Sequence, residues 1–134
     1  ETVSRTYVEG NKFSDNQKKL YSMAVEQIHH NARLIKPGMS FKEFTEKSWV
    51  LPEEYYGNRY SVMVHGIGLC DEWPAIRYPT DGGERSGTFE TNMTITVESY
   101  IGKVGGNEGV KLEQQYLVGK NNLELMSHHP LEDI

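Results

Sequence analysis

The feature that most constrains the fold of this chain is a pair of strand-like segments joined by a glycine-rich loop. Residues 91–101 and 109–118 are rich in β-branched and other apolar residues, and the loop between them is built largely from glycine. If the two segments fold back on each other about the centre of this loop, counting outward places Glu98 directly opposite Glu113. The sequence therefore predicts an antiparallel hairpin with two acids paired across it.

The predicted pairing places two negative charges close enough to repel each other. Directly opposed cross-strand residues have Cβ atoms about 4.5–5.5 Å apart, and like charges at that separation are destabilising. Glu98 and Glu113 would then have to share either a proton or a cation. A bulge that shifted the register by one residue would send them to opposite faces of the sheet. The alternative interpretation is that both are ordinary solvent-facing strand acids.

A second stretch carries chemically active side chains in close succession. Residues 64–74 contain His65, two glycines and the neighbouring carboxylates Asp71 and Glu72. Imidazole combined with carboxylates is a common ligand set for transition metals. A histidine in this position therefore favours a shared cation over a shared proton for the acids of the hairpin.

Helical periodicity occurs in the N-terminal half of the chain. Ser14 followed by Gln17 forms a capping-box pattern, and the apolar residues after it recur at helical spacing. This pattern predicts a long helix that ends before Pro37, because proline cannot continue the hydrogen-bond ladder. A second capping box predicts a shorter helix over residues 41–51.

The remaining segments indicate strands, loops and an irregular tail. Residues 2–8 and 61–65 have the composition of short strands, whereas residues 53–60 and 73–87 carry loop signals. Residues 121–134 show no strong pattern. Two helices packed on one face of an antiparallel sheet give an α+β fold.

Composition excludes several classes of protein. The chain has 134 residues, of which 37% are hydrophobic and 25% charged, which is typical of one globular domain. A net charge of −5 and the lack of a basic stripe argue against nucleic-acid binding. No apolar run is long enough to span a membrane. Cys70 is the only cysteine, which fits a reducing compartment and predicts a cytoplasmic protein.

Five short motifs follow one another along the chain. They are Ser4-Arg5-Thr6-Tyr7, Ile35-Lys36-Pro37-Gly38, His65-Gly66-Ile67-Gly68-Leu69, Val97-Glu98-Ser99 and Lys111-Leu112-Glu113. In this order they resemble the creatinase/aminopeptidase P family, whose pita-bread fold also occurs in methionine aminopeptidase and prolidase. The resemblance covers only the C-terminal part of such a domain. It implies that residues 1–134 are a single, partial creatinase/aminopeptidase-like catalytic domain, the C-terminal half of a pita-bread fold.

The resemblance also implies a ligand set. His65, Glu98 and Glu113 would hold divalent ions (Mn, Fe, Co or Zn) in a two-metal site, with Glu113 bridging. Such ions activate water or orient a substrate, here a small molecule or a short peptide. Thr2 stands where the family has its second ligand aspartate, and the first would fall before Glu1. We therefore expect a fragment with weak activity or none, and the alternative that it binds no metal by itself stays open.

The residues after His65 resemble a different branch, the peptidase-like dimethylsulfoniopropionate lyases. Glu72 stands where peptidase members carry a second histidine. Asp71 stands where the lyases carry the acidic residue that is thought to act as their catalytic base. A β-elimination needs such a base, together with a cation to hold the substrate carboxylate. We expect catalytic roles for Asp71 and Glu72, a substrate contact from Trp73 to a sulfonium group, and Arg5 beside a carboxylate of the site, where it would contact substrate.

Three functions therefore remain open. The main interpretation is a fragment of a metal-dependent Xaa-Pro aminopeptidase of the creatinase family. One alternative is a lyase that catalyses β-elimination, and the other is a non-catalytic, metal-free binding module. Half of a two-part sheet also leaves an unpaired strand edge and uncovered apolar surface. A second copy related by a two-fold axis would cover both, so we expect a homo-oligomer.

Overall fold

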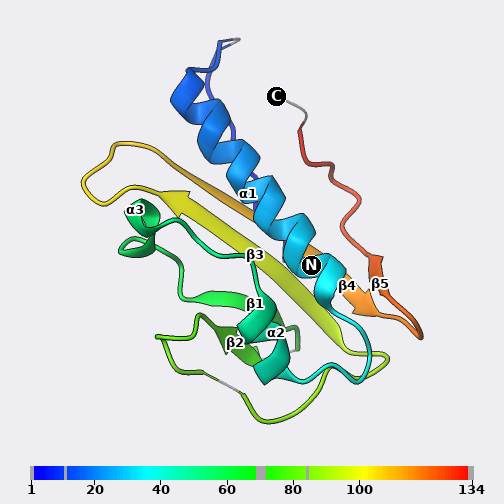
Figure 1. The fold of residues 1–134 in the computed structure, drawn as a ribbon. Coiled ribbons are helices and arrows are strands. Elements are labelled where there is room, and N and C mark those ends of the chain that lie inside the picture. Colours follow the sequence, from blue (N-terminus) through cyan, green and yellow to red (C-terminus); the bar gives the residue numbers. More distant parts are fainter. Residues whose placement is uncertain (1, 11, 69–71, 84, 133–134) are drawn as a thin grey trace.

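The structure is a computed structural model that describes residues 2–10, 12–68, 72–83 and 85–132. Within these ranges the chain forms one antiparallel sheet with helices on one face, which confirms the predicted α+β class (Figure 1). The strand order is β2-β1-β3-β4-β5. The strands are β1 (Val62–Gly66), β2 (Ala75–Arg77), β3 (Thr94–Gly102), β4 (Gly109–Val118) and β5 (Leu123–Leu125).

Helix α1 (Asp15–Leu34) forms where the sequence predicts it. The Ser14 hydroxyl accepts the backbone N–H of Gln17 at 3.1 Å, and the Gln17 side chain accepts the N–H of Ser14 at 2.9 Å. This reciprocal box fixes the first turn. The buried face, at spacings of three and four residues, packs on β3 and β4 through Leu20, Tyr21, Ala24, Gln27, Ile28 and Asn31.

Helix α2 (Phe41–Lys47) begins as predicted but is shorter than expected. The Ser40 hydroxyl caps it by accepting a backbone N–H of the first turn at 3.0 Å. The helix ends at Lys47 instead of near residue 51. Ser48 already has extended backbone, and its hydroxyl donates to the carbonyl of Thr45 at 3.0 Å. That bond satisfies one of the carbonyls that a helix end leaves free, so the helix stops there.

Three short elements lie in segments predicted to be irregular. Helix α3 (Glu53–Tyr56) is a single turn within the loop predicted at 53–60. Strand β2 (Ala75–Arg77) lies within the loop predicted at 73–87 and pairs with β1. Strand β5 (Leu123–Leu125) lies in the tail and pairs with β4. Elements of three or four residues are too short to show periodicity, and pairing with a neighbouring strand decides whether they form.

The N-terminal segment, predicted as a strand over residues 2–8, joins the sheet at one bridge only. Ser4 exchanges two backbone hydrogen bonds with Glu113 on β4, at 3.3 and 3.1 Å. Two residues later the Thr6 hydroxyl takes over, donating to the carbonyl of Lys111 at 2.8 Å and accepting its N–H at 2.9 Å. A side chain thus replaces the main chain as the partner of β4, and the ladder ends.

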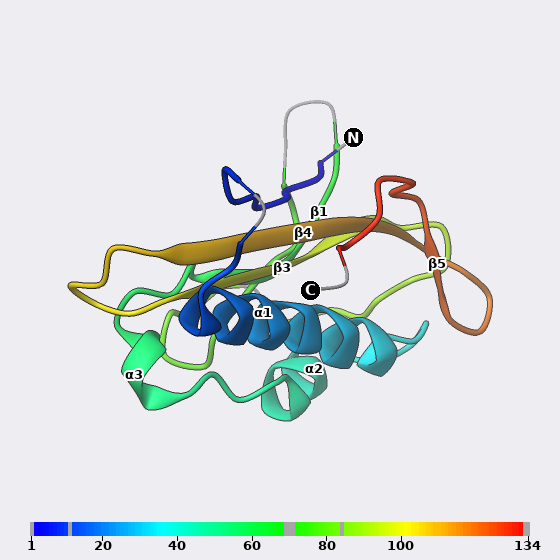
Figure 2. The ribbon, with the colours of Figure 1, turned by 90° about the horizontal axis from the view of Figure 1, so that it is seen from above.

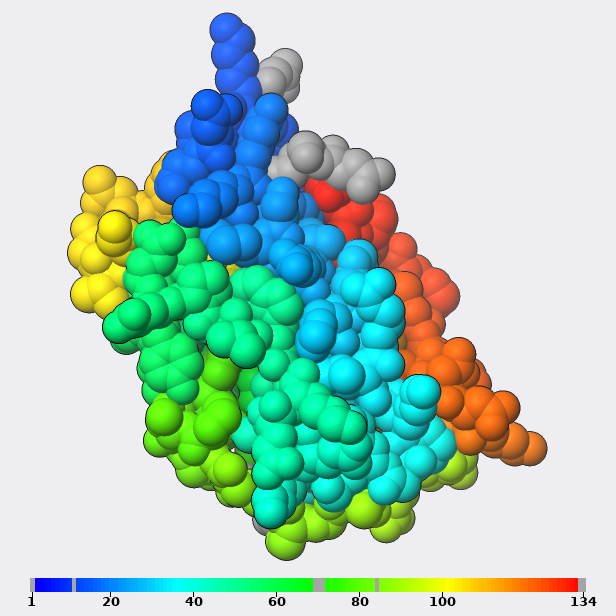
Figure 3. Space-filling model, in the orientation of Figure 1, coloured from blue at the N-terminus to red at the C-terminus, as the bar shows by residue number. Residues whose placement is uncertain are grey.

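The sheet separates an apolar face from a polar one. Residues of β3 and β4 that face α1 form much of the core, namely Ile95, Val97, Ile101, Val110, Leu112, Tyr116 and Val118. The helices and their connections cover this face (Figure 3), and the first residues of the chain lie on the other side of the sheet (Figure 2). The opposite face carries Thr96 and Glu98 from β3 and Glu113 and Gln115 from β4, all buried.

A buried polar contact ties α1 to the sheet. Gln27 donates to the Tyr78 hydroxyl at 2.6 Å and accepts a hydrogen bond from the Ser99 hydroxyl at 2.6 Å. All three side chains are buried. Among the described residues, no helix combines the length and apolar character needed to cross a bilayer.

Candidate metal centre

Three neighbouring strands bring His65, Glu98 and Glu113 together on the face away from the helices. In the β3–β4 register Glu98 pairs directly with Glu113, as the sequence predicts. On the other side of β3, His65 of β1 pairs with Thr96. Thr96 precedes Glu98 by two residues and so shares its face. The three ligand candidates are only 5%, 2% and 4% exposed.

The three side chains converge on one point. His65 Nε2 lies 2.9 Å from Oε1 of Glu98 and 3.4 Å from Oε1 of Glu113. One ligand atom from each residue falls within 4.8 Å of the other two. This convergence is the geometry expected of a shared cation, and the alternative of solvent-facing strand acids is wrong, since both carboxylates are buried.

Hydrogen bonding determines which imidazole nitrogen faces the acids. His65 Nδ1 lies 2.8 Å from the carbonyl oxygen of Gly66, and a carbonyl can only accept, so Nδ1 carries a proton. Nε2 is therefore turned toward the two carboxylates. Apart from this contact with the imidazole, neither Glu98 Oε1 nor Glu113 Oε1 has a hydrogen-bond partner among the described residues. Two buried acceptors and one imidazole nitrogen aimed together fit a divalent ion.

The second oxygen of each carboxylate is held by a neighbour. The Ser4 hydroxyl donates to Oε2 of Glu113 at 2.9 Å. The Lys111 ammonium contacts Oε2 of Glu98. These contacts leave the other oxygen of each carboxylate turned toward His65. Sequence reasoning missed both roles, although Lys111 stands two residues before Glu113 and so had to share its face.

Charges around the centre shift the pKa values of its groups. Burial favours the neutral form of Glu113, but hydrogen bonds from His65 and Ser4 and the charge of Lys111 outweigh it and lower the pKa. Burial also opposes protonation of His65, yet the hydrogen bond with Glu113 and the carbonyl of Gly66 raise its pKa. The net effect keeps Glu113 ionised, as a metal ligand must be.

The predicted catalytic acids lie in the β1–β2 connection. Asp71 is outside the described residues, so its predicted role as a base stays a prediction. Glu72 is exposed, and its charge raises the pKa of His65, which places Glu72 near the centre. Trp73 is 56% exposed, and its ring meets that of Phe41 edge-on at 6.4 Å between centroids. Contact of Trp73 with a substrate also stays a prediction.

Arg5 is engaged with backbone instead of a carboxylate. Its guanidinium donates to the carbonyl of Glu113 at 2.6 Å and to that of Pro130 at 2.9 Å, and it also contacts the carbonyls of Ser4 and His129. These bonds tie the C-terminal tail to β4. Among the described residues Arg5 pairs with no carboxylate of the site, so the pairing predicted for it is not found there, and a substrate contact stays a prediction.

An aromatic ring missed by the sequence reasoning lies at the rim of the centre. The Lys111 ammonium that contacts Glu98 also lies 3.9 Å from the ring centroid of Tyr60, a cation–π contact. Tyr60 is 45% exposed. The sequence could not predict the position of Tyr60. The residue lies in a connection, where residue spacing does not indicate the direction of a side chain.

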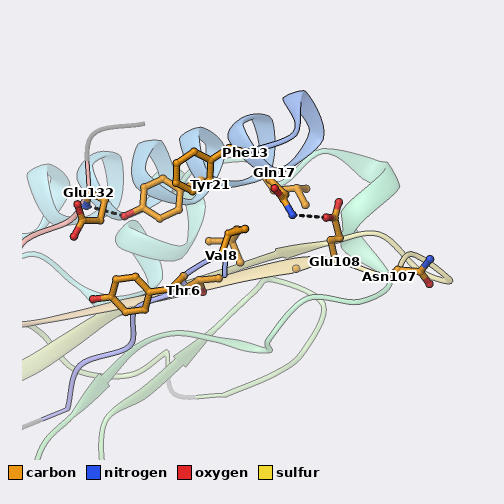
Figure 4. Close-up of a pocket in the computed structure, with 12 residues that line it drawn as sticks. Thr6, Val8, Phe13, Gln17, Tyr21, Asn107, Glu108 and Glu132 are labelled. Carbon is orange, nitrogen blue, oxygen red and sulfur yellow. Dashed lines mark hydrogen bonds between the residues drawn. The ribbon is translucent and has the colours of Figure 1, made fainter. Parts of the chain in front are cut away.

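A separate cavity of about 480 Å³ lies away from the centre, between α1, the N-terminal segment and the start of β4 (Figure 4). Its wall includes Gln17, which donates to Glu108 at 2.7 Å, and Tyr21, whose hydroxyl accepts the N–H of Glu132 at 2.8 Å. None of the three ligand candidates lines it. The cavity therefore plays no part in the geometry of the metal centre.

An antiparallel sheet with helices on one face and a histidine and two glutamates on the other defines the class of pita-bread-fold proteins, here with a candidate metal centre. The particular family follows from the sequence. Residues 2–120 match the family described as metallopeptidase family M24, and the chain belongs to this family. The expected kinship with Xaa-Pro peptidases and the expected pita-bread fold are thereby confirmed.

Individual relatives carry two kinds of name. The chain is 37% identical over 117 residues to the dimethylsulfoniopropionate lyase DddP of Roseovarius nubinhibens, covering 84% of this chain and 26% of the lyase. It superposes on the prolidase of Pyrococcus horikoshii with a TM-score of 0.79 and 25% identity, covering 98% of this chain and 37% of the prolidase. It superposes on the Xaa-Pro dipeptidase of Bacillus anthracis with a TM-score of 0.77 and 27% identity. That match covers 98% of this chain and 36% of the dipeptidase. The chain thus spans between 26% and 37% of the length of these proteins.

Proposed function

We propose that this chain is part of the catalytic domain of a metal-dependent lyase, and that His65, Glu98 and Glu113 are ligands of its metal centre. The substrate class we infer is a sulfonium carboxylate of the dimethylsulfoniopropionate type. The observation that carries the proposal is the cation–π contact at the rim, where an ammonium lies 3.9 Å from the Tyr60 ring and touches Glu98. The identity with DddP supports the same reading.

The reaction is a β-elimination in which the groups of this chain have distinct tasks. A carboxylate of the β1–β2 connection, Asp71 or Glu72, takes a proton from the carbon next to the substrate carboxylate. The electron pair left behind forms the carbon–carbon double bond as the carbon–sulfur bond breaks, which releases dimethyl sulfide and acrylate. Tyr60 holds the sulfonium through its ring face. When bound, the divalent ion would hold the substrate carboxylate and offset charge that develops beside it.

Hydrolysis of Xaa-Pro peptides is the second candidate. It is favoured by the similarity to solved prolidase and Xaa-Pro dipeptidase structures. The feature that weighs against it is Glu72, which stands where the peptidases are expected to carry a second histidine. A carboxylate at that position can accept a proton but cannot act as the neutral imidazole does in moving protons to a leaving amine.

The test uses the full-length polypeptide, loaded in turn with Mn²⁺, Fe²⁺, Co²⁺ and Zn²⁺. We expect dimethyl sulfide in the headspace over dimethylsulfoniopropionate and no proline release from an Xaa-Pro dipeptide. Tyr60→Ala should raise KM for the sulfonium substrate about ten-fold, the worth of one cation–π contact. Tyr60→Phe keeps the ring face and is the matched control. Proline release without dimethyl sulfide would establish the peptidase instead.

Four further expectations remain proposals. The sheet ends in the three-residue strands β2 and β5. Such short edges are a common protection against strand-to-strand association, so a two-fold homo-oligomer would have to use another surface. A cytoplasmic location, the metal-free alternative and weak activity of this chain alone also await measurement.

A further inference from the structure

Lys111 occupies a position that the ligand set does not explain. It lies on β4 two residues before Glu113, so its side chain enters the same buried face of the sheet. Its ammonium contacts Oε2 of Glu98, the oxygen on the side away from His65. The lysine therefore touches a ligand candidate from the side opposite to the point where the ligand atoms converge.

The charges around the two carboxylates show why a cation is needed there. Glu98 and Glu113 are directly opposed and almost fully buried. Within the described ranges, the cationic or titratable side chains paired with them are His65 from β1 and Lys111 from β4. Arg5 reaches only the backbone of Glu113. Removing a buried carboxylate's cation leaves an uncompensated charge, which destabilises a fold strongly.

Resting on the proposed metal centre, we propose that Lys111 is the internal counter-ion of Glu98 in the metal-free chain and is displaced when a divalent ion binds. The divalent ion supplies the positive charge that Lys111 otherwise provides, so the two compete for Glu98. The lysine can leave Glu98 toward solvent, because its side chain is 30% exposed and its ammonium already lies at the rim, beside the exposed Tyr60 ring. A flexible four-carbon stem with a point charge can make this movement, which a planar guanidinium fork does less readily.

The proposal predicts effects of opposite sign for one substitution. Lys111→Met keeps the apolar stem and removes the competitor. The metal-free chain should therefore become less stable, while its affinity for a divalent ion should rise. A lysine that merely supports the ligand geometry would give losses in both quantities. Opposite signs therefore separate a counter-ion from a positioning residue.

The experiment uses Zn²⁺, which accepts three protein ligands and an open fourth position. Isothermal titration should show Lys111→Met binding Zn²⁺ about ten-fold more tightly than wild type, and thermal unfolding in chelator should show a lower Tm. Lys103→Met is the control, since Lys103 is exposed and pairs only loosely with Glu54, at 3.8 Å. Equal or weaker Zn²⁺ binding by Lys111→Met would overturn the proposal.

A second measurement does not depend on the folding of any variant. Reductive methylation of the wild-type chain, read by peptide mass spectrometry, should modify Lys111 slowly without metal and several-fold faster with Zn²⁺. An unchanged or slower rate would overturn the displacement. If Glu113→Gln abolishes Zn²⁺ binding and Lys111→Met leaves it unchanged, Lys111 is not the counter-ion that the metal displaces. The assignment of the metal centre would then still hold. Binding that is indifferent to Glu113→Gln would refute the centre itself.

Discussion

Glu98 and Glu113 are partners across β3 and β4, and each turns one carboxylate oxygen toward Nε2 of His65, at 2.9 and 3.4 Å. Neither oxygen has another hydrogen-bond partner among the described residues. The pair is therefore electrostatically incomplete, since two buried acceptors face the same imidazole nitrogen. The group that compensates the two carboxylates can be identified by substituting one residue of the site at a time.

Glu113→Gln should abolish the shared centre. The amide keeps the shape of the side chain but supplies neither a negative charge nor the same ligand strength, so we expect Zn²⁺ affinity to fall by at least about a hundred-fold. Calorimetric titration measures it. Glu90→Gln, at an exposed position in the described chain, serves as the control and should bind as wild type does. Unchanged affinity in Glu113→Gln would contradict the ligand assignment.

Gly66→Ala should disrupt the close packing of the end of β1 against Trp73 and Pro74. A Cβ at this position would lie 1.9 Å from the carbonyl oxygen of Trp73, so backbone must move. We expect a loss of about 3 kcal/mol in the free energy of unfolding, the upper part of the range for overpacking. Denaturant titration measures this loss. In the control Gly57→Ala, the new Cβ meets only the exposed side chain of Val104 at 3.0 Å, which can move aside.

Gln27→Leu should weaken the attachment of α1 to the sheet. The leucine fills similar volume but leaves the hydroxyls of Ser99 and Tyr78 buried without the partner that now satisfies both. Each unsatisfied group costs about 1–3 kcal/mol, so we expect a loss of about 2–4 kcal/mol in unfolding free energy. Lys18→Leu on the exposed face of the same helix is the comparison and should change little. A loss below about 1 kcal/mol in Gln27→Leu would argue against the network.

Arg5→Lys should release the C-terminal tail. The guanidinium donates to backbone carbonyls on both β4 and the tail, and an ammonium cannot reproduce that fork. We expect amide hydrogen exchange across residues 126–132 to accelerate about ten-fold, with β3 unaffected. Arg33→Lys, whose guanidinium bonds only the His29 carbonyl of its own helix, should leave the tail unchanged. Protection that persists in Arg5→Lys would mean that other contacts hold the tail.

The sequence was enough to predict those elements whose own residues show a clear periodicity, capping or turn pattern. The capping box at Ser14 and the apolar spacing after it gave α1, and the glycine-rich loop gave the register that pairs Glu98 with Glu113. Strand β2 and helix α3 escaped prediction because three or four residues cannot display a period. The N-terminal strand was overestimated because Thr6 replaces a backbone bond with its hydroxyl, which no pattern of residue types announces.

The sequence by itself determined which residues have the chemistry of a metal centre, because alternation along a strand fixes facing once the register is known. Only the tertiary structure decided which groups compensate the buried charges of those residues. The contacts of Lys111 with Tyr60, of Ser4 with Glu113, and of Arg5 with the tail all join segments whose distance in the chain says nothing about their proximity in space. Burial then decides the electrostatics, since a carboxylate removed from water needs a partner that only packing can supply.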